Sequence, residues 1–175
     1  KAPLSLVMEI SGDASGDVLT DTTTDITLND NLLTWNGVGG ALNGTIDLSS
    51  DAGLRISENR AEINATVNLY GGDLDIDATT DLYGSLMTAQ QRDASFDIEQ
   101  GKTLILHNPL DIESDSRLKI AGGGFLTLNG LTADGTADIR STHITSNGDI
   151  HVSSAGELHI TDTDIEFGCD NTHDS

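Results

Sequence analysis

The chain has 175 residues, and its 29 acidic and 8 basic side chains give a formal net charge of −21. A field of this sign repels phosphate backbones and anionic lipids, so the composition argues against nucleic-acid binding. The single cysteine, Cys169, excludes an internal disulfide and a zinc site built from several cysteines. No apolar run is long enough to predict a membrane span.

The length suits one domain that covers residues 1–175. Aromatic residues make up only 3% of the chain, so the core must be built from Leu, Ile, Val and Ala. Thin layers of aliphatic side chains suit a narrow coil in which each turn of the chain covers its neighbour.

Residues 1–24 are predicted to form an edge strand and an Asp-rich turn. Apolar residues alternate from Leu4 to Ile10, and the unpaired backbone of such an edge could pair with another subunit. The turn then offers oxygen ligands at alternate positions, a pattern that can wrap calcium. It lacks the glycine and the closing glutamate of an EF-hand loop, so a solvated turn is the alternative. The candidate ligands are Asp13, Ser15, Asp17 and Asp21.

Apolar pairs separated by one polar residue predict short coil-forming strands across residues 25–84. Trp35, the only tryptophan, is a candidate sugar platform or interface residue, and packing in the core is the alternative. Asn43 and Asn64 match the N-glycan acceptor pattern, which matters only in a compartment that glycosylates.

Asp73, Asp75 and Asp77 lie at alternate positions of one predicted strand, so their carboxylates share a face. Like charges on one face repel each other, so we expect either full exposure to solvent or a bound cation. These three residues are therefore a second candidate calcium site.

Residues 85–94 interrupt the alternation with good helix formers. This segment is predicted to be a short helical turn or a loop inserted between two sets of coils. As a candidate recognition loop it would offer Met87, Gln90 and Arg92 to a glycan or cell-surface ligand, and a simple connector is the alternative.

Residues 95–167 are the most regular part of the chain, and residues 168–175 are a polar tail. The apolar pairs recur about every seven or eight residues, with Gly, Asn, Asp or Ser between them. Three such strands in one coil would give a repeat of roughly 24 residues, which is typical of solenoids. The pairs are Phe96/Ile98, Leu104/Leu106, Leu110/Ile112, Leu118/Ile120, Leu126/Leu128, Ile150/Val152, Leu158/Ile160 and Ile165/Phe167.

We therefore predict an all-β parallel β-solenoid with about three short strands per coil. Asn-Gly dipeptides favour hairpin turns on local grounds, so an antiparallel β-sandwich is the alternative fold. These dipeptides begin at Asn36, Asn43, Asn129 and Asn147.

His143, His151 and His159 are eight residues apart. In a solenoid with three strands per coil, this spacing places them on successive faces, too far apart to bind one metal ion. In hairpins two of them could come closer.

Polysaccharide lyases and pectin hydrolases also use parallel β-helices, so an enzyme is a third possible class. Arg117-Leu-Lys119 resembles the Arg-Ile-Lys element of pectin hydrolases, but their Asn-Thr-Asp and Gly-His-Gly elements are missing. With few basic residues and few aromatics to stack sugars, we expect no enzymatic activity.

Three runs of the regular stretch share a Gly/Ser-x-Leu-x-Ile/Leu character: Ser116-Arg-Leu-Lys-Ile120, Gly124-Phe-Leu-Thr-Leu128 and Ala155-Gly-Glu-Leu-His-Ile160. They resemble the repeats of autotransporter passengers and filamentous-haemagglutinin-type adhesins over roughly residues 45–167. This resemblance implies a right-handed parallel β-helix that lies outside the cell as a stalk, adhesin or fibre.

An uncapped solenoid leaves an open sheet edge at each end, so its subunits can join head to tail. The expected function is that of an extracellular or cell-surface structural protein, a homo-oligomer or polymer that forms a filament. A carbohydrate-binding stalk or adhesin fragment is the alternative. Calcium is the one cofactor that the acidic runs suggest.

Overall fold

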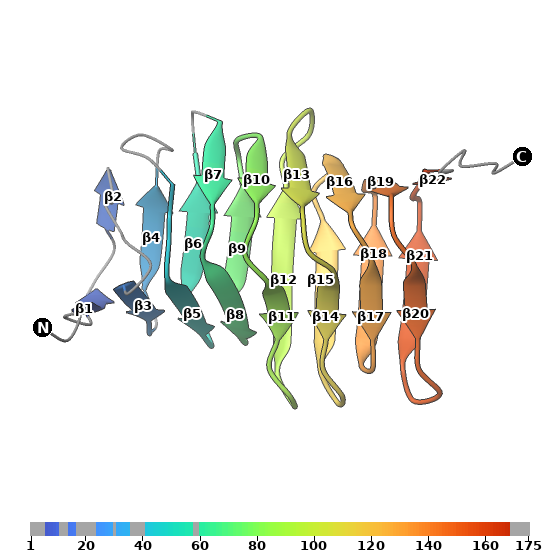
Figure 1. Cartoon of the computed structure of the whole chain (residues 1–175), viewed down its shortest axis with the longest axis horizontal. Coiled ribbons are helices and arrows are strands. Elements are labelled where there is room, and N and C mark those ends of the chain that lie inside the picture. Colours follow the sequence, from blue (N-terminus) through green and yellow to red (C-terminus); the bar gives the residue numbers. More distant parts are fainter. Residues whose placement is uncertain are drawn as a thin grey trace, which may run out of the picture.

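The computed structural model is a rod in which short parallel strands wind around one long axis (Figure 1). It describes residues 6–10, 14–16, 24–29, 31–35, 41–57 and 60–168, with the backbone alone for residues 6–10, 14–16 and 24. Regular structure in these ranges consists entirely of β-strands. No helix among them is long and apolar enough to cross a bilayer.

The strands form three sheets, and each sheet makes one side of the rod (Figure 1). Sheet A contains β1 (Leu6–Ile10), β3 (Thr24–Leu28), β5 (Thr45–Ser49), β8 (Thr66–Tyr70), β11 (Leu86–Thr88), β14 (Leu110–Ile112), β17 (Leu131–Ala133) and β20 (Ile150–Val152). Sheet B contains β2 (Ala14–Gly16), β4 (Leu32–Trp35), β6 (Gly53–Ile56), β9 (Asp73–Ile76), β12 (Asp93–Ile98), β15 (Arg117–Ala121), β18 (Thr136–Arg140) and β21 (Glu157–Thr161). Sheet C contains β7 (Ala61–Ile63), β10 (Thr80–Leu82), β13 (Thr103–Leu106), β16 (Phe125–Leu128), β19 (His143–Ser146) and β22 (Ile165–Phe167).

The predicted β-solenoid with three strands per coil is confirmed, because from β5 onward the chain visits sheets A, B and C in turn. Every pairing between these strands is parallel, so the antiparallel sandwich is wrong. The repeat varies in length: Val67 pairs with Leu86, 19 residues on, and Leu86 pairs with Leu110, 24 residues on.

Three of the four Asn-Gly dipeptides form corners of the coil in place of hairpins, and the fourth, which begins at Asn36, lies outside the described residues. Asn43-Gly44, Asn129-Gly130 and Asn147-Gly148 all lie where the chain passes from the sheet C side to sheet A. Gly44 and Gly130 have φ of 89° and 125°, a region that glycine enters without a Cβ clash. A turn residue that suits a hairpin therefore also suits the change of direction between two sheets.

The core is a set of aliphatic rows that run along the axis inside the rod. One such row in sheet B passes from Leu54 through Leu74, Phe96, Ile120 and Ile139, which are in register and at most 1% exposed. Because each coil covers the one before it, a residue is buried by its sheet neighbours rather than by a second layer.

The prediction of a helical turn at residues 85–94 is wrong for Leu86–Thr88, which form β11 of sheet A. Leu86 pairs with Val67 on one side and with Leu110 on the other, and its side chain is buried. Helix propensity is a weak preference, and the pairing with two neighbouring strands overrides it here.

Candidate functional site

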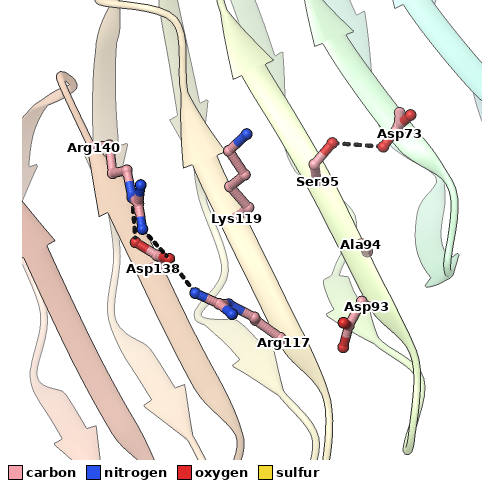
Figure 2. Close-up of a pocket in the computed structure, with 8 residues that line it drawn as sticks. All are labelled: Asp73, Asp93, Ala94, Ser95, Arg117, Lys119, Asp138 and Arg140. Carbon is pink, nitrogen blue, oxygen red and sulfur yellow. Dashed lines mark hydrogen bonds and ion pairs between the residues drawn. The ribbon is translucent and has the colours of Figure 1, made fainter.

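The outer face of sheet B contains an open hollow (Figure 2). It is an open depression of about 470 Å³ that crosses strands β9 to β18. Its polar lining alternates with the buried aliphatic rows, because successive residues of a strand point to opposite faces. The lining residues are Asp73, Asp93, Ala94, Ser95, Arg117, Lys119, Asp138 and Arg140.

Asp138 holds two arginines together at one side of the hollow. Arg117 Nη2 lies 2.5 Å from Asp138 Oδ2, and Arg140 donates to both carboxylate oxygens at 2.8 and 2.9 Å (Figure 2). The Asp138 side chain is only 3% exposed. Hydrogen bonds from Arg140 and then Arg117 outweigh the effect of burial and lower the pKa of Asp138 to about 2. Asp138 is therefore a permanent anion at physiological pH.

Lys119 lies between Ser95 and Asp138 in the register of sheet B, with an exposed side chain. Its ammonium group points away from Asp138 in Figure 2 and makes no hydrogen bond or ion pair with a described residue. Both Asp138 oxygens are already bonded to Arg117 and Arg140. Lys119 therefore offers an unneutralised positive charge to the hollow.

The three predicted calcium ligands Asp73, Asp75 and Asp77 do share the outer side of sheet B, at and beyond β9. Arg55 from β6 lies 3.4 Å from Asp75 Oδ2 and 3.2 Å from Asp77 Oδ2. Ser95 Oγ donates to Asp73 Oδ1 at 2.5 Å. No group of three or more metal-ligating side chains converges within the described ranges. The Arg55 guanidinium thus lies beside two of the three carboxylates that the sequence predicted as calcium ligands. Calcium binding at these residues stays a prediction.

Asp75 has the opposite electrostatic environment to Asp138. Burial raises its pKa above the ordinary value, and repulsion from Asp77, Asp73 and Asp97 adds to this rise. Attraction by Arg55 opposes the rise but does not cancel it. The negative charge of Asp73, Asp75 and Asp77 is therefore only partly neutralised by Arg55.

The other candidate calcium site lies largely outside the described residues. Asp13, Asp17 and Asp21 fall there, and Ser15 belongs to β2 with its backbone alone described. Cys169 and the rest of the polar tail after Gly168 also fall outside. This site stays a prediction.

Trp35 is fully buried, so the prediction of an exposed sugar platform there is wrong. Trp35 is in register with Ile56 of the neighbouring strand, and its side chain points into the core. This is the packing role that the sequence offered as the alternative.

Met87 and Gln90 line a smaller hollow of about 210 Å³ on the sheet A side. Gln90 Nε2 donates to Ser114 Oγ at 3.0 Å, and Arg92 is exposed.

The two glycan acceptor candidates stack on each other at the corner between sheets C and A. Asn64 Nδ2 donates to Asn43 Oδ1 at 3.1 Å, and Asn43 Nδ2 donates to the Ala41 carbonyl at 2.9 Å. Three coils further along, Asn129 Nδ2 donates to the His107 carbonyl at 2.9 Å. Asn43 thus bonds to the corner backbone and Asn64 bonds to Asn43, which gives both residues a structural role that sequence inspection missed.

The three evenly spaced histidines lie on different sheets, as the solenoid prediction required. His143 belongs to β19 of sheet C, His151 to β20 of sheet A and His159 to β21 of sheet B. They therefore cannot bind one metal ion together.

Sequence reasoning also missed a polar cluster on the outer face of sheet C. Asp81 accepts hydrogen bonds from Arg60 Nε at 2.9 Å and Nη2 at 2.5 Å, and its Oδ1 lies 3.2 Å from His107 Nε2. Burial raises the pKa of Asp81, but the hydrogen bonds from Arg60 and His107 outweigh it and the pKa is lowered. The Tyr83 ring stacks on His107 with centroids 4.0 Å apart, close to the spacing of neighbouring strands. These residues are distant in sequence and become neighbours only through the coil.

The last coil leaves inward-facing aliphatic residues uncovered. Val152 of β20 and Ile160 of β21 continue the rows of Ala133 and Ile139, yet they are 37% and 38% exposed. No described strand follows β20 in sheet A or β21 in sheet B. This end therefore combines open sheet edges with exposed apolar surface.

Comparison with known proteins gave no match to a family model, a curated protein or a solved structure. The resemblance to autotransporter and haemagglutinin-type repeats therefore stays a prediction.

Proposed function

We propose that this protein is a structural subunit of an extracellular or cell-surface filament, in which copies of the rod stack head to tail. The observation that carries the proposal is the uncovered last coil, where Val152 and Ile160 are exposed at inward positions. Burying such aliphatic side chains favours association by about 25 cal/mol for each Å² of apolar area.

The partner that fits this end is the first coil of a second copy. Strands β1 and β2 are the opposite outer strands of sheets A and B, at the other end of the rod (Figure 1). Since strands within each sheet run parallel, β20 facing β1 and β21 facing β2 would continue the same pairing. A contact between two different surfaces of identical subunits has no built-in stop and produces a filament.

An edge variant tests this proposal. Val152→Asp places a carboxylate under the incoming coil, where burial of an unpaired charge is costly, and we expect assembly to be lost. His151→Asp is the matched control, because His151 is the preceding residue of β20 and its side chain is exposed on the outer face.

Sedimentation velocity at several protein concentrations gives the readout, with circular dichroism to check that each variant is folded. We expect concentration-dependent polymers for the unchanged protein and His151→Asp, and folded monomers for Val152→Asp. Monomers for the unchanged protein, or equal polymers for both variants, would contradict head-to-tail stacking.

A further inference from the structure

The sheet B hollow holds three basic and three acidic side chains, in a chain whose net charge is −21. Three of the eight basic residues, Arg117, Lys119 and Arg140, lie on its two neighbouring strands β15 and β18. Asp138 neutralises the two arginines in part, whereas Lys119 has no anionic partner among the described residues. Lys119 can therefore bind an anionic group of a ligand in the hollow.

Arg117 can contribute to the same anion. It lies two residues before Lys119 on β15, so both side chains leave the same face of the sheet. Its contact with Asp138 uses Nη2, which leaves Nε and Nη1 without a described partner. Because Asp138 holds the guanidinium in place, little side-chain freedom is lost when a carboxylate binds there.

The other side of the hollow accepts hydrogen bonds. Asp93 is in register with Arg117, and Asp73 lies across β12 from Lys119, with Ser95 between them (Figure 2). Carboxylates at these positions repel a second anionic group but accept hydrogen bonds from hydroxyls. A ligand that matches both sides carries one negative charge and several hydroxyl groups.

We propose that the sheet B hollow binds a single acidic sugar residue such as a uronic acid. Its carboxylate contacts Lys119 and Arg117, and its hydroxyls donate to Asp93 and Asp73. The hollow of about 470 Å³ lies within the range of small-molecule sites. Neighbouring strands are about 4.8 Å apart, so a sugar residue that lies over Ser95 of β12 has Lys119 of β15 on one side and Asp73 of β9 on the other. The site is on a side of the rod and does not depend on end-to-end stacking.

The test is calorimetric titration of the full chain with glucuronate and with glucuronamide, which keeps the hydroxyls but removes the charge. We expect binding of glucuronate and at least tenfold weaker binding of glucuronamide, because a charge-assisted hydrogen bond is lost. Lys119→Gln should weaken glucuronate binding by a similar factor. Lys102→Gln removes a lysine that lies outside the hollow and should bind as the unchanged protein does.

Sulfate distinguishes a sugar site from a general anion site. We expect sulfate to compete weakly, since it offers no hydroxyl donors to Asp93 and Asp73. Absence of glucuronate binding, equal binding of glucuronamide, or an unchanged affinity in Lys119→Gln would overturn the proposal. Equal affinity for sulfate would overturn its sugar part. Sedimentation of Lys119→Gln should remain as for the unchanged protein, so failure here is separable from failure of the filament.

Discussion

Asp138 shows how a single residue stabilises the outer face of a coil. Its two arginine partners come from β15 and β18, so the cluster ties neighbouring coils together. Asp138→Asn should lower the free energy of unfolding at pH 7 by about 1–2 kcal/mol, because asparagine carries no negative charge and its Nδ2 cannot accept a hydrogen bond from either arginine.

The pH dependence of this loss follows from the lowered pKa. Asp138 titrates near 2 in the folded protein and near 3.9 in an unfolded chain, so its contribution is fully present above about pH 5. It disappears as the pH falls toward 2. Urea unfolding of both proteins at pH 7 and pH 2 should show a difference in stability only at pH 7. An equal difference at both values would contradict this assignment.

Asp75 should behave in the opposite sense. Its raised pKa means that its charged form opposes folding at neutral pH, and protonation in the folded protein relieves this as the pH is lowered. Asp75→Asn should therefore raise the melting temperature at pH 7, while Arg55 keeps its contact with Asp77.

The control for Asp75→Asn is Asp111→Asn, which removes the same charge from β14 of sheet A. We expect a smaller change for the control, because Asp111 is not part of the row of carboxylates on sheet B. A lower melting temperature for Asp75→Asn than for the control would show that the Arg55 contact dominates.

At the scale of an element, burial depends on where a strand lies along the rod. Ile120 of β15 and Ile160 of β21 occupy the same inward row of sheet B, but their exposed fractions are 0% and 38%. Ile120→Ala should destabilise the monomer by about 2–5 kcal/mol through lost contacts and a cavity. Ile160→Ala should cost markedly less.

Thermal denaturation of dilute protein measures these two costs for the monomer. Under conditions in which the protein assembles, the filament proposal predicts that Ile160→Ala also weakens polymer formation. Equal destabilisation of the monomer by both variants would mean that the last coil is covered in solution by something other than a second copy.

Much of this element pattern could be predicted from sequence. Alternation at Leu104/Leu106 and Leu126/Leu128 identified strands β13 and β16 because each strand buries only one side. It failed at Leu86–Thr88, where a short strand lies within a run of helix formers. The Asn-Gly dipeptides predicted where the chain turns but not the geometry of the turn. A corner between two sheets and a hairpin both favour Asn-Gly, so the dipeptide does not distinguish them.

The candidate sites were less accessible to prediction. The repeat varies from 18 to 24 residues between neighbouring coils, so no fixed offset shows that Arg60 contacts Asp81 or that Arg117 contacts Asp138. For Trp35 the sequence left an exposed platform and a packing role both open, because sequence alone does not show which way a lone aromatic residue points. Lys119 was noted beside Arg117, but its missing partner became visible only in the register of β12, β15 and β18.

At the scale of the whole molecule, charge and stacking oppose each other. Each copy carries a net charge of −21, so two rods that approach end to end repel each other at long range. Salt screens this repulsion over about 10 Å at 0.1 M, whereas burial of Val152 and Ile160 does not depend on charge. Assembly should therefore increase between about 0.01 M and 0.5 M sodium chloride. Light scattering that decreases over this range would indicate association through ion pairs.

Electron cryomicroscopy of the protein assembled in salt tests head-to-tail stacking most directly. Eight strands in sheet A, spaced about 4.8 Å apart, predict filaments with an axial subunit repeat of roughly 38 Å. The strand spacing should continue without a break across each junction from β20 to β1. Separate single rods under these conditions, or filaments in which the rods lie side by side with free ends, would contradict the account.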